Sequence, residues 1–161
     1  MKFPAVLLSV LFMTWLMPVA TGADKGPMHN HPSAAGFGSP GKESQVTRTV
    51  EVQASDDMRF SPGRIEVKRG ETIRFVVRNT GKIAHEFSIG DRNAHKAHAA
   101  MMKSMPDMHH EDSETTVMVE PGKTKTLIWK FDKQPAGPLE IACNIPGHYE
   151  AGMKAPVALR R

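Results

Sequence analysis

The chain has 161 residues, a formal net charge of +4 and a single cysteine. So mild a charge, with no basic segments interleaved with aromatic residues, argues against a nucleic-acid-binding protein. One cysteine excludes a disulfide within the chain, so the thiol needs another explanation. The length is enough for one ordinary domain with one hydrophobic core.

An apolar run near the start of the chain predicts export. Lys2 precedes the run FPAVLLSVLFMTWLMPVA, and the small residues TGAD follow it, which is the layout of a secretory signal peptide. We expect cleavage after Ala23, or else after Ala20, so that residues 1–23 are removed and the mature chain is periplasmic with no membrane segment. An uncleaved anchor is the alternative, because the run is near the length of a spanning helix. The loop-like sequence that follows favours cleavage.

The rest of the chain divides into a lead-in and a strand-rich domain. Residues 24–44 are rich in Gly, Pro and Ser, which predicts a flexible N-terminal segment. Residues 45–161 contain short runs of alternating apolar residues between turn signals, which predicts an all-β domain, an antiparallel sandwich or barrel of seven to eight strands. The expected strands cover residues 47–54, 64–70, 72–79, 85–89, 115–122, 125–131, 139–143 and 154–159.

A long insertion, residues 90–115, interrupts these strands. Its sequence predicts one short helix over residues 93–104 or an irregular segment, and Pro106 ends the helix. Thioethers favour Cu(I) and imidazoles accept Cu(II), so its Met and His side chains are candidates for auxiliary copper binding. The alternative is a solvated loop whose methionines cover an edge of the sandwich. The candidates are His95, His98, Met101, Met102, Met105, Met108, His109 and His110.

Two polar residues are expected on the core side of the sandwich. His85 alternates with Phe87, and Cys143 alternates with Ile141, so each points to the same side as an apolar neighbour. An unpaired imidazole is costly in such a position. Each polar residue lies at one end of its apolar run, which indicates a site at the edge of the sandwich.

Four side chains together offer the donor atoms that copper prefers. Cys143, His148 and Met153 lie on one segment with four residues in each gap, and His85 lies on a separate strand. A thiolate and two imidazoles suit both Cu(I) and Cu(II) in a trigonal site with a long axial methionine. Zinc is the chemical alternative, although methionine is a poor zinc ligand. Each residue alone could be ordinary core packing.

The segment that carries three of these residues must fold back on itself. Five extended residues span about 17 Å, whereas the ligands of one metal lie a few ångströms apart. Pro146 and Gly147 precede His148, and Gly152 precedes Met153. These residues supply the expected turns.

Residues 46–160 resemble the cupredoxins, the type 1 copper family that includes plastocyanin and azurin. NTGKIAHEFSI is similar to the strand that supplies the first histidine, and CNIPGHYEAGM is similar to the loop that supplies the other ligands. The resemblance implies a cupredoxin-like Greek-key β-sandwich with copper as cofactor. It also implies that His85, Cys143 and His148 are equatorial ligands and that Met153 is the axial ligand.

One position departs from the family pattern. Plastocyanin and azurin usually have an asparagine after the first histidine, which helps hold the copper loop and hydrogen-bonds the thiolate, whereas this chain has Glu86. Asn144 is a candidate to fill part of that role. The departure bears on redox potential and colour, because hydrogen bonds around the sulfur tune both.

Two functions fit such a domain. The first is copper handling, in which the exported protein binds, buffers or transfers copper, confers tolerance and works with a copper-transport protein. The second is a mobile one-electron carrier between redox partners, with Ile145, Pro146 and Tyr149 as a docking patch beside His148. The Met- and His-rich insertion favours copper handling, since an electron carrier has no evident use for it. An enzyme is least favoured, because multicopper oxidases and copper nitrite reductases need further copper centres and a second domain.

Overall fold

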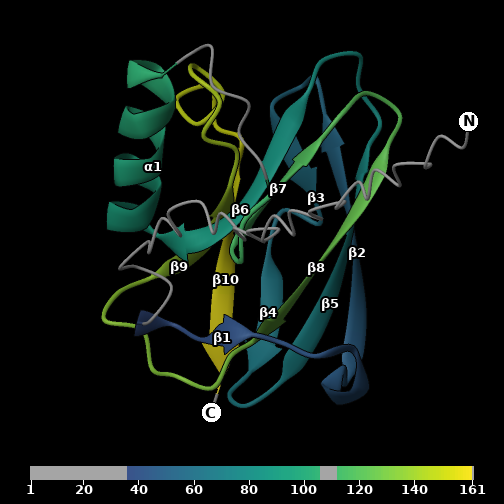
Figure 1. Ribbon diagram of the computed structural model, residues 1–161, viewed down its shortest axis with the longest axis vertical. Coiled ribbons are helices and arrows are strands. Elements are labelled where there is room, and N and C mark those ends of the chain that lie inside the picture. Colours follow the sequence, from purple (N-terminus) through teal and green to yellow (C-terminus); the bar gives the residue numbers. More distant parts are fainter. Residues whose placement is uncertain (1–35, 106–111, 161) are drawn as a thin grey trace, which may run out of the picture. The chain divides into compact units, whose positions relative to one another are not determined.

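Two five-stranded sheets and one helix make up the computed structural model, which describes residues 36–105 and 112–160 (Figure 1). The sheets have the strand orders β1-β8-β5-β2-β3 and β4-β10-β9-β6-β7. The predicted signal peptide lies outside the described residues. The strands are β1 (Ser39–Pro40), β2 (Arg48–Ser55), β3 (Arg59–Ser61), β4 (Ile65–Lys68), β5 (Thr72–Asn79), β6 (His85–Asp91), β7 (Thr116–Val119), β8 (Thr124–Lys130), β9 (Leu139–Ala142) and β10 (Lys154–Arg160).

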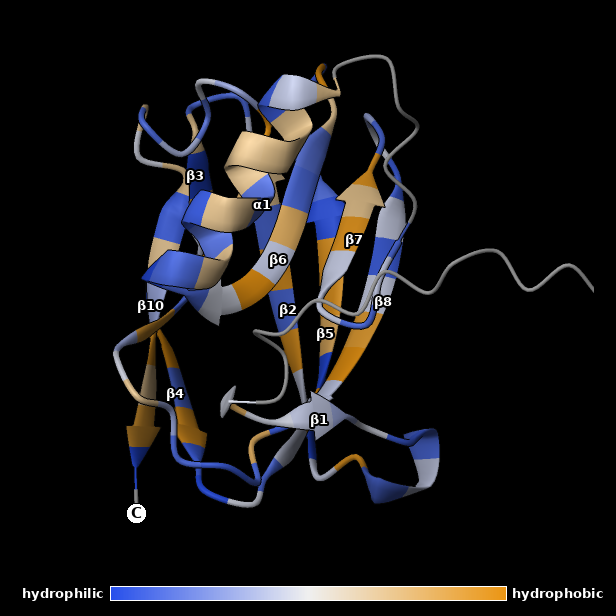
Figure 2. Ribbon diagram, turned by 60° about the vertical axis from the view of Figure 1, so that its left-hand side comes forward, coloured by the Kyte–Doolittle hydropathy of each residue, from blue (hydrophilic) through white to orange (hydrophobic). Residues whose placement is uncertain are grey.

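The core contains the inward-facing residues of both sheets. In β2, Val50, Val52 and Ala54 are buried and the residues between them are exposed, as the period of two in the sequence predicts. Phe75 of β5 packs its ring 5.3 Å from that of Phe87 of β6, between centroids, so the two sheets meet face to face. Figure 2 shows hydrophobic residues along the strands of both sheets. The predicted all-β sandwich is confirmed.

Not all strand pairs are antiparallel, contrary to the prediction. β2 pairs with β5 in parallel, and β10 pairs with β4 in parallel. Parallel neighbours need a connection that returns to the same end of the sheet. The chain between β2 and β5 does this by passing through β4, which belongs to the other sheet. Local alternation carries no information on strand direction, so the sequence could not reveal it.

The predicted helix is present as α1 (Arg92–Ser104). Asp91 caps it, because its side chain accepts a hydrogen bond of 2.8 Å from the amide of Ala94. The helix packs against β6 and β9, beside the loop that leads into β10 (Figure 1). In the part of the chain that the structure describes, no helix combines the length and hydrophobicity needed to cross a membrane.

β6 is buried on both of its faces, which alternation did not predict. Residues 85–90 are all buried, because one face points into the core and the other faces α1. Glu86 and Ser88 are therefore enclosed although their positions in the strand are polar. The position of α1 thus decides the environment of the residue that follows His85.

The packed fold begins before residue 45. Residues 24–44 were predicted to be flexible, but Phe37 is 2% exposed and its ring centroid lies 5.4 Å from that of Trp129. β1 pairs with β8, and a 3-10 helix, η2 (Glu43–Gln45), follows it. A single aromatic residue among Gly, Pro and Ser gives no periodic signal, so the prediction missed this contact. The remainder of that segment, 24–35, lies outside the described residues.

Candidate metal centre

His85 presents an unpaired ring nitrogen at the start of β6. Its Nε2 lies 3.1 Å from Oδ1 of Asp56, and a carboxylate can only accept, so Nε2 carries the hydrogen and Nδ1 the lone pair. Nδ1 is buried and has no hydrogen-bond partner. Such an atom is costly unless another group satisfies it, and a carboxylate behind an imidazole is the usual arrangement of a metal-binding histidine. His85 therefore fits a metal ligand better than a core residue.

Asp56 is suited to hold this imidazole. The pKa of its carboxyl is lowered, first because the amide of Lys82 donates a hydrogen bond to it, and further because His85 donates another. The carboxylate is therefore ionised at neutral pH. It orients the ring of His85 from the side away from Nδ1.

Cys143 follows β9 and is fully buried. Its Sγ accepts a hydrogen bond of 3.3 Å from the amide of Glu86. Burial raises the pKa of the thiol to about 12, although the backbone amides of Glu86 and Ile145 act in the opposite direction. A metal must therefore displace the thiol proton when it binds.

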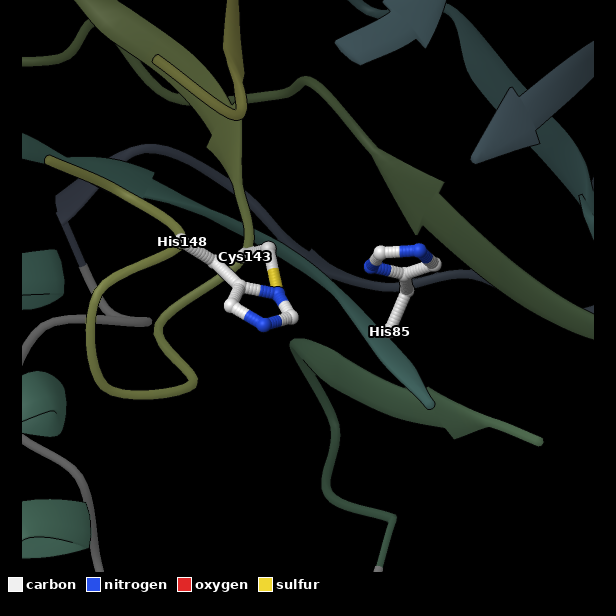
Figure 3. A group of neighbouring side chains, drawn as sticks. All are labelled: His85, Cys143 and His148. Carbon is white, nitrogen blue, oxygen red and sulfur yellow. The ribbon is translucent and has the colours of Figure 1, made fainter. Parts of the chain in front are cut away.

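His148 completes a group of three donors. Its Nδ1 lies 3.3 Å from Sγ of Cys143, and its ring centroid lies 5.3 Å from that of His85. The donor atoms of the three residues all lie within 4.8 Å of one another (Figure 3). Burial lowers the pKa of the His148 ring, and the neighbouring His85 ring lowers it further, so the neutral form that binds metals predominates at neutral pH.

The segment between Cys143 and Met153 folds back as predicted. The amide of Cys143 bonds to the carbonyl of Met153, and the amide of Met153 bonds to the carbonyl of His148, each at 3.0 Å. Gly147 and Gly152 have φ of +89° and +100°, conformations that favour glycine. Met153 is fully buried in the same hydrophobic cluster as Cys143.

Gly152→Ala should destabilise this loop. A Cβ there would lie 2.7 Å from Nη1 of Arg59, and the positive φ strains any residue with a side chain. Arg59 also donates to the carbonyl of Ala151 at 3.0 Å, so it cannot move away freely. We expect a loss of about 1–3 kcal/mol in the free energy of unfolding, measured by denaturant titration of the metal-free protein. Gly63→Ala is the control, because a Cβ there meets nothing within 4 Å; equal stabilities of the two variants would contradict the prediction.

Glu86 has a part in the site that sequence reasoning missed. Its side chain is fully buried, and its Oε1 accepts from Nδ2 of Asn144 at 2.7 Å and from the amide of Asn144 at 3.3 Å. Glu86 therefore holds the loop of Cys143 through Asn144, while the backbone amide of Glu86 donates to the sulfur of Cys143. The signals in the sequence were a glutamate within a short apolar strand next to His85 and its departure from the asparagine usual in the family.

The helical part of the insertion faces the fold more than we expected. His95 is 2% exposed and Met102 is 4% exposed. Nε2 of His95 lies 3.2 Å from the carbonyl oxygen of Glu140, and its Nδ1 lies 3.3 Å from Nδ2 of Asn144. Both ring nitrogens of His95 are thus engaged in hydrogen bonds within the protein.

The other candidates for auxiliary copper binding lie in different surroundings. His98 and Met101 line a cavity of about 410 Å³ between α1 and the segment before β7. Met105 is exposed. Met108, His109 and His110 lie outside the described residues. Within residues 36–105 and 112–160, the Cys, His, Asp and Glu donors converge in a group of three only at His85, Cys143 and His148.

Comparison with known proteins gives the family. Residues 46–160 match the family described as copper binding proteins, plastocyanin/azurin family. The chain belongs to this family. The predicted cupredoxin resemblance and the predicted copper cofactor are both confirmed. The donors present fit that metal, since they are a thiol and two imidazoles, one of which has a buried unpaired nitrogen.

Curated relatives of this cupredoxin cover nearly its whole length. A copper-resistant cuproprotein CopI of Rubrivivax gelatinosus is 45% identical over 98% of this chain and 96% of the relative. Its namesake in Pseudomonas aeruginosa is 38% identical over 94% of this chain and 95% of the relative.

Among solved structures, auracyanin B has a TM-score of 0.60 at 21% identity, covering 78% of this chain and 97% of that one. Auracyanin A of Chloroflexus aurantiacus, a blue copper protein, has a TM-score of 0.53 at 18% identity, covering 70% of this chain and 98% of that one. At these identities, the likeness shows the fold alone.

Proposed function

We propose that this cupredoxin binds copper through His85, Cys143 and His148, with Met153 as axial ligand, and that it handles copper in the periplasm and confers copper tolerance. The observation that carries the site is the convergence of three donor atoms within 4.8 Å. The tolerance role is supported by relatives named copper-resistant cuproproteins, which are 38–45% identical over most of the chain. An electron carrier has no comparable support.

The roles of the residues follow from their contacts. Asp56 orients His85, buried surroundings exclude water from Cys143, and the loop turns bring His148 beside the sulfur. A bound copper ion would supply the change between Cu(I) and Cu(II). A binding, buffering or transferring role needs no substrate site, so we propose that the protein is not an enzyme. Its partners would be the copper ion and a periplasmic copper-transport or redox protein.

The periplasmic location is supported by the signal-like sequence of residues 1–23. Fractionation of cells and mass spectrometry of the mature N-terminus test it. A protein that keeps its first residues and stays with the membrane would contradict it.

Deletion of the gene tests the tolerance role. We expect the deletion strain to grow less well than the parent at raised copper concentrations, and the wild-type gene to restore growth. A gene encoding Cys143→Ser, expressed at the same level, should not restore it. Equal growth of parent and deletion strain across a copper series would contradict tolerance.

Auxiliary copper binding by the insertion is a separate part of the proposal, supported by its Met and His content. We expect the mature protein to bind more than one copper ion per chain. Replacing the candidates other than His95, His98 and Met102 should remove the extra copper and leave the coloured site intact, because the buried His95 and Met102 stay in place. The replacements are Met101→Leu, Met105→Leu, Met108→Leu, His109→Gln and His110→Gln. The copper-to-protein ratio and the visible spectrum measure both effects, and a wild-type ratio of one would contradict the proposal.

A further inference from the structure

A cluster of buried polar side chains lies between α1 and the loop of Cys143. Glu86, His95 and Asn144 are each at most 2% exposed. The side chain of His98 is 16% exposed. Buried polar groups of this kind persist only when they are hydrogen-bonded to one another. None of these four residues belongs to the candidate metal site of His85, Cys143 and His148. Their burial therefore needs a different explanation.

The carboxylate of Glu86 is the centre of this cluster. Its Oε2 lies 2.8 Å from Nε2 of His98, while its Oε1 accepts from the side chain and the backbone amide of Asn144. A buried carboxylate is expensive unless several donors surround it. Here the donors come from both α1 and the copper loop, so the carboxylate bonds them to each other.

Glu86 is connected to the metal centre both through Asn144 and through its own backbone. Asn144 follows Cys143 in the chain, and the backbone amide of Glu86 donates to Sγ of Cys143 at 3.3 Å. Glu86 itself follows His85. A displacement of the carboxylate would therefore move the sulfur, its hydrogen-bond donor and one imidazole together.

A second contact joins α1 to the same loop. Nδ2 of Asn144 lies 3.3 Å from Nδ1 of His95, whose Nε2 is fixed by the carbonyl of Glu140 in β9. The helix thus holds Asn144 directly through His95 and indirectly through His98 and Glu86. In this arrangement His95 and His98 support the proposed copper site of Cys143 through hydrogen bonds. In auxiliary copper binding, they would themselves be ligands.

We infer that Glu86 is a positioning residue for the copper thiolate and that His98 of α1 holds its carboxylate in place. The inference rests on the proposed ligand role of Cys143. It gives helix α1 a role in positioning Cys143 at the proposed copper site. This role does not depend on auxiliary copper binding by the insertion.

His98→Ala is the decisive variant, because His98 is only partly buried and its loss should spare the fold. In the metal-free protein, we expect alkylation of Cys143 by iodoacetamide to be on the order of tenfold faster, since losing a buried hydrogen bond to a charged group favours local opening. In the Cu(II)-loaded protein, we expect the thiolate-to-copper absorption and the paramagnetic resonance spectrum to shift. His98→Gln should restore both, because its Nε2 can donate to Glu86 from a similar position.

Variants of Glu86 and a control on α1 test whether the effect comes from the carboxylate. Glu86→Gln retains an acceptor for Asn144 and should give a smaller change than Glu86→Ala, with folding followed by circular dichroism. Lys96→Ala, on an exposed residue of the same helix, should match the wild type in both measurements.

Two results would overturn the inference. In the first, His98→Ala matches the wild type in both alkylation and spectrum. In the second, it lowers only the number of copper ions bound, which would make His98 an auxiliary ligand. The alkylation rate is measured without metal, so it still tests positioning if Cys143 proves not to be a copper ligand.

Discussion

We expect Cys143→Ser to remove the proposed coloured copper site while leaving the fold in place. A serine hydroxyl has nearly the shape of the thiol and can still accept the hydrogen bond from the amide of Glu86. It cannot supply the soft anionic sulfur that stabilises both Cu(I) and Cu(II). Because loss of an outer partner alone costs up to about 100-fold in metal affinity, loss of this ligand should cost more than about 100-fold.

Titration with Cu(II) against a competing chelator measures this affinity, and visible absorption reports the thiolate bond. The circular dichroism spectrum of the metal-free variant should match that of the wild type. Ser88→Ala is a matched control for loss of a small buried polar group, because Ser88 bonds to Thr116 and not to the metal centre. A variant at position 143 that keeps the absorption would refute the ligand assignment.

Phe37→Ala should give the largest loss of stability among these variants. Phe37 is 2% exposed and packs on Trp129, which is fully buried. Removing a buried phenylalanine side chain costs about 3–5 kcal/mol, from lost transfer energy and the cavity that remains. Denaturant titration of the metal-free protein measures the difference.

Ile83→Ala is the control for this variant, because Ile83 is 43% exposed and its loss should change the free energy of unfolding by no more than about 0.5 kcal/mol. A chain that starts at residue 45 loses the whole of β1 and should be at least as unstable as Phe37→Ala. If that shortened chain is as stable as one that starts at residue 36, the packing of Phe37 contributes nothing and the domain does begin at residue 45.

The two segments that carry the metal centre could be recognised because their signals are local. His85 and Cys143 alternate with apolar residues over a few positions, and Gly147 and Gly152 mark turns that only glycine makes easily. Ligand spacing within one loop is a short-range property, so sequence alone indicated three of the four donors together. The fourth, His85, followed from its strand and from the family resemblance.

The surroundings of that centre depend on contacts between distant segments. Glu86 and His98 are separated by 12 residues and Glu86 and Asn144 by 58. No local pattern predicts that a helix will cover the second face of β6 and bury that carboxylate. The parallel pairing of β2 with β5 and the contact of Phe37 with Trp129 were missed for the same reason.

By itself, the sequence determined the strand-rich fold, the candidate copper ligands and the expectation of copper handling. It could do so because alternation, turn residues and donor chemistry are all encoded within short segments. Only the tertiary structure decided which polar side chains support those donors, since burial and hydrogen bonding depend on which elements pack together. The sequence presented the histidines of the helix as candidates for auxiliary copper binding, and packing against β6 and β9 places His95 beside Asn144 and His98 beside Glu86.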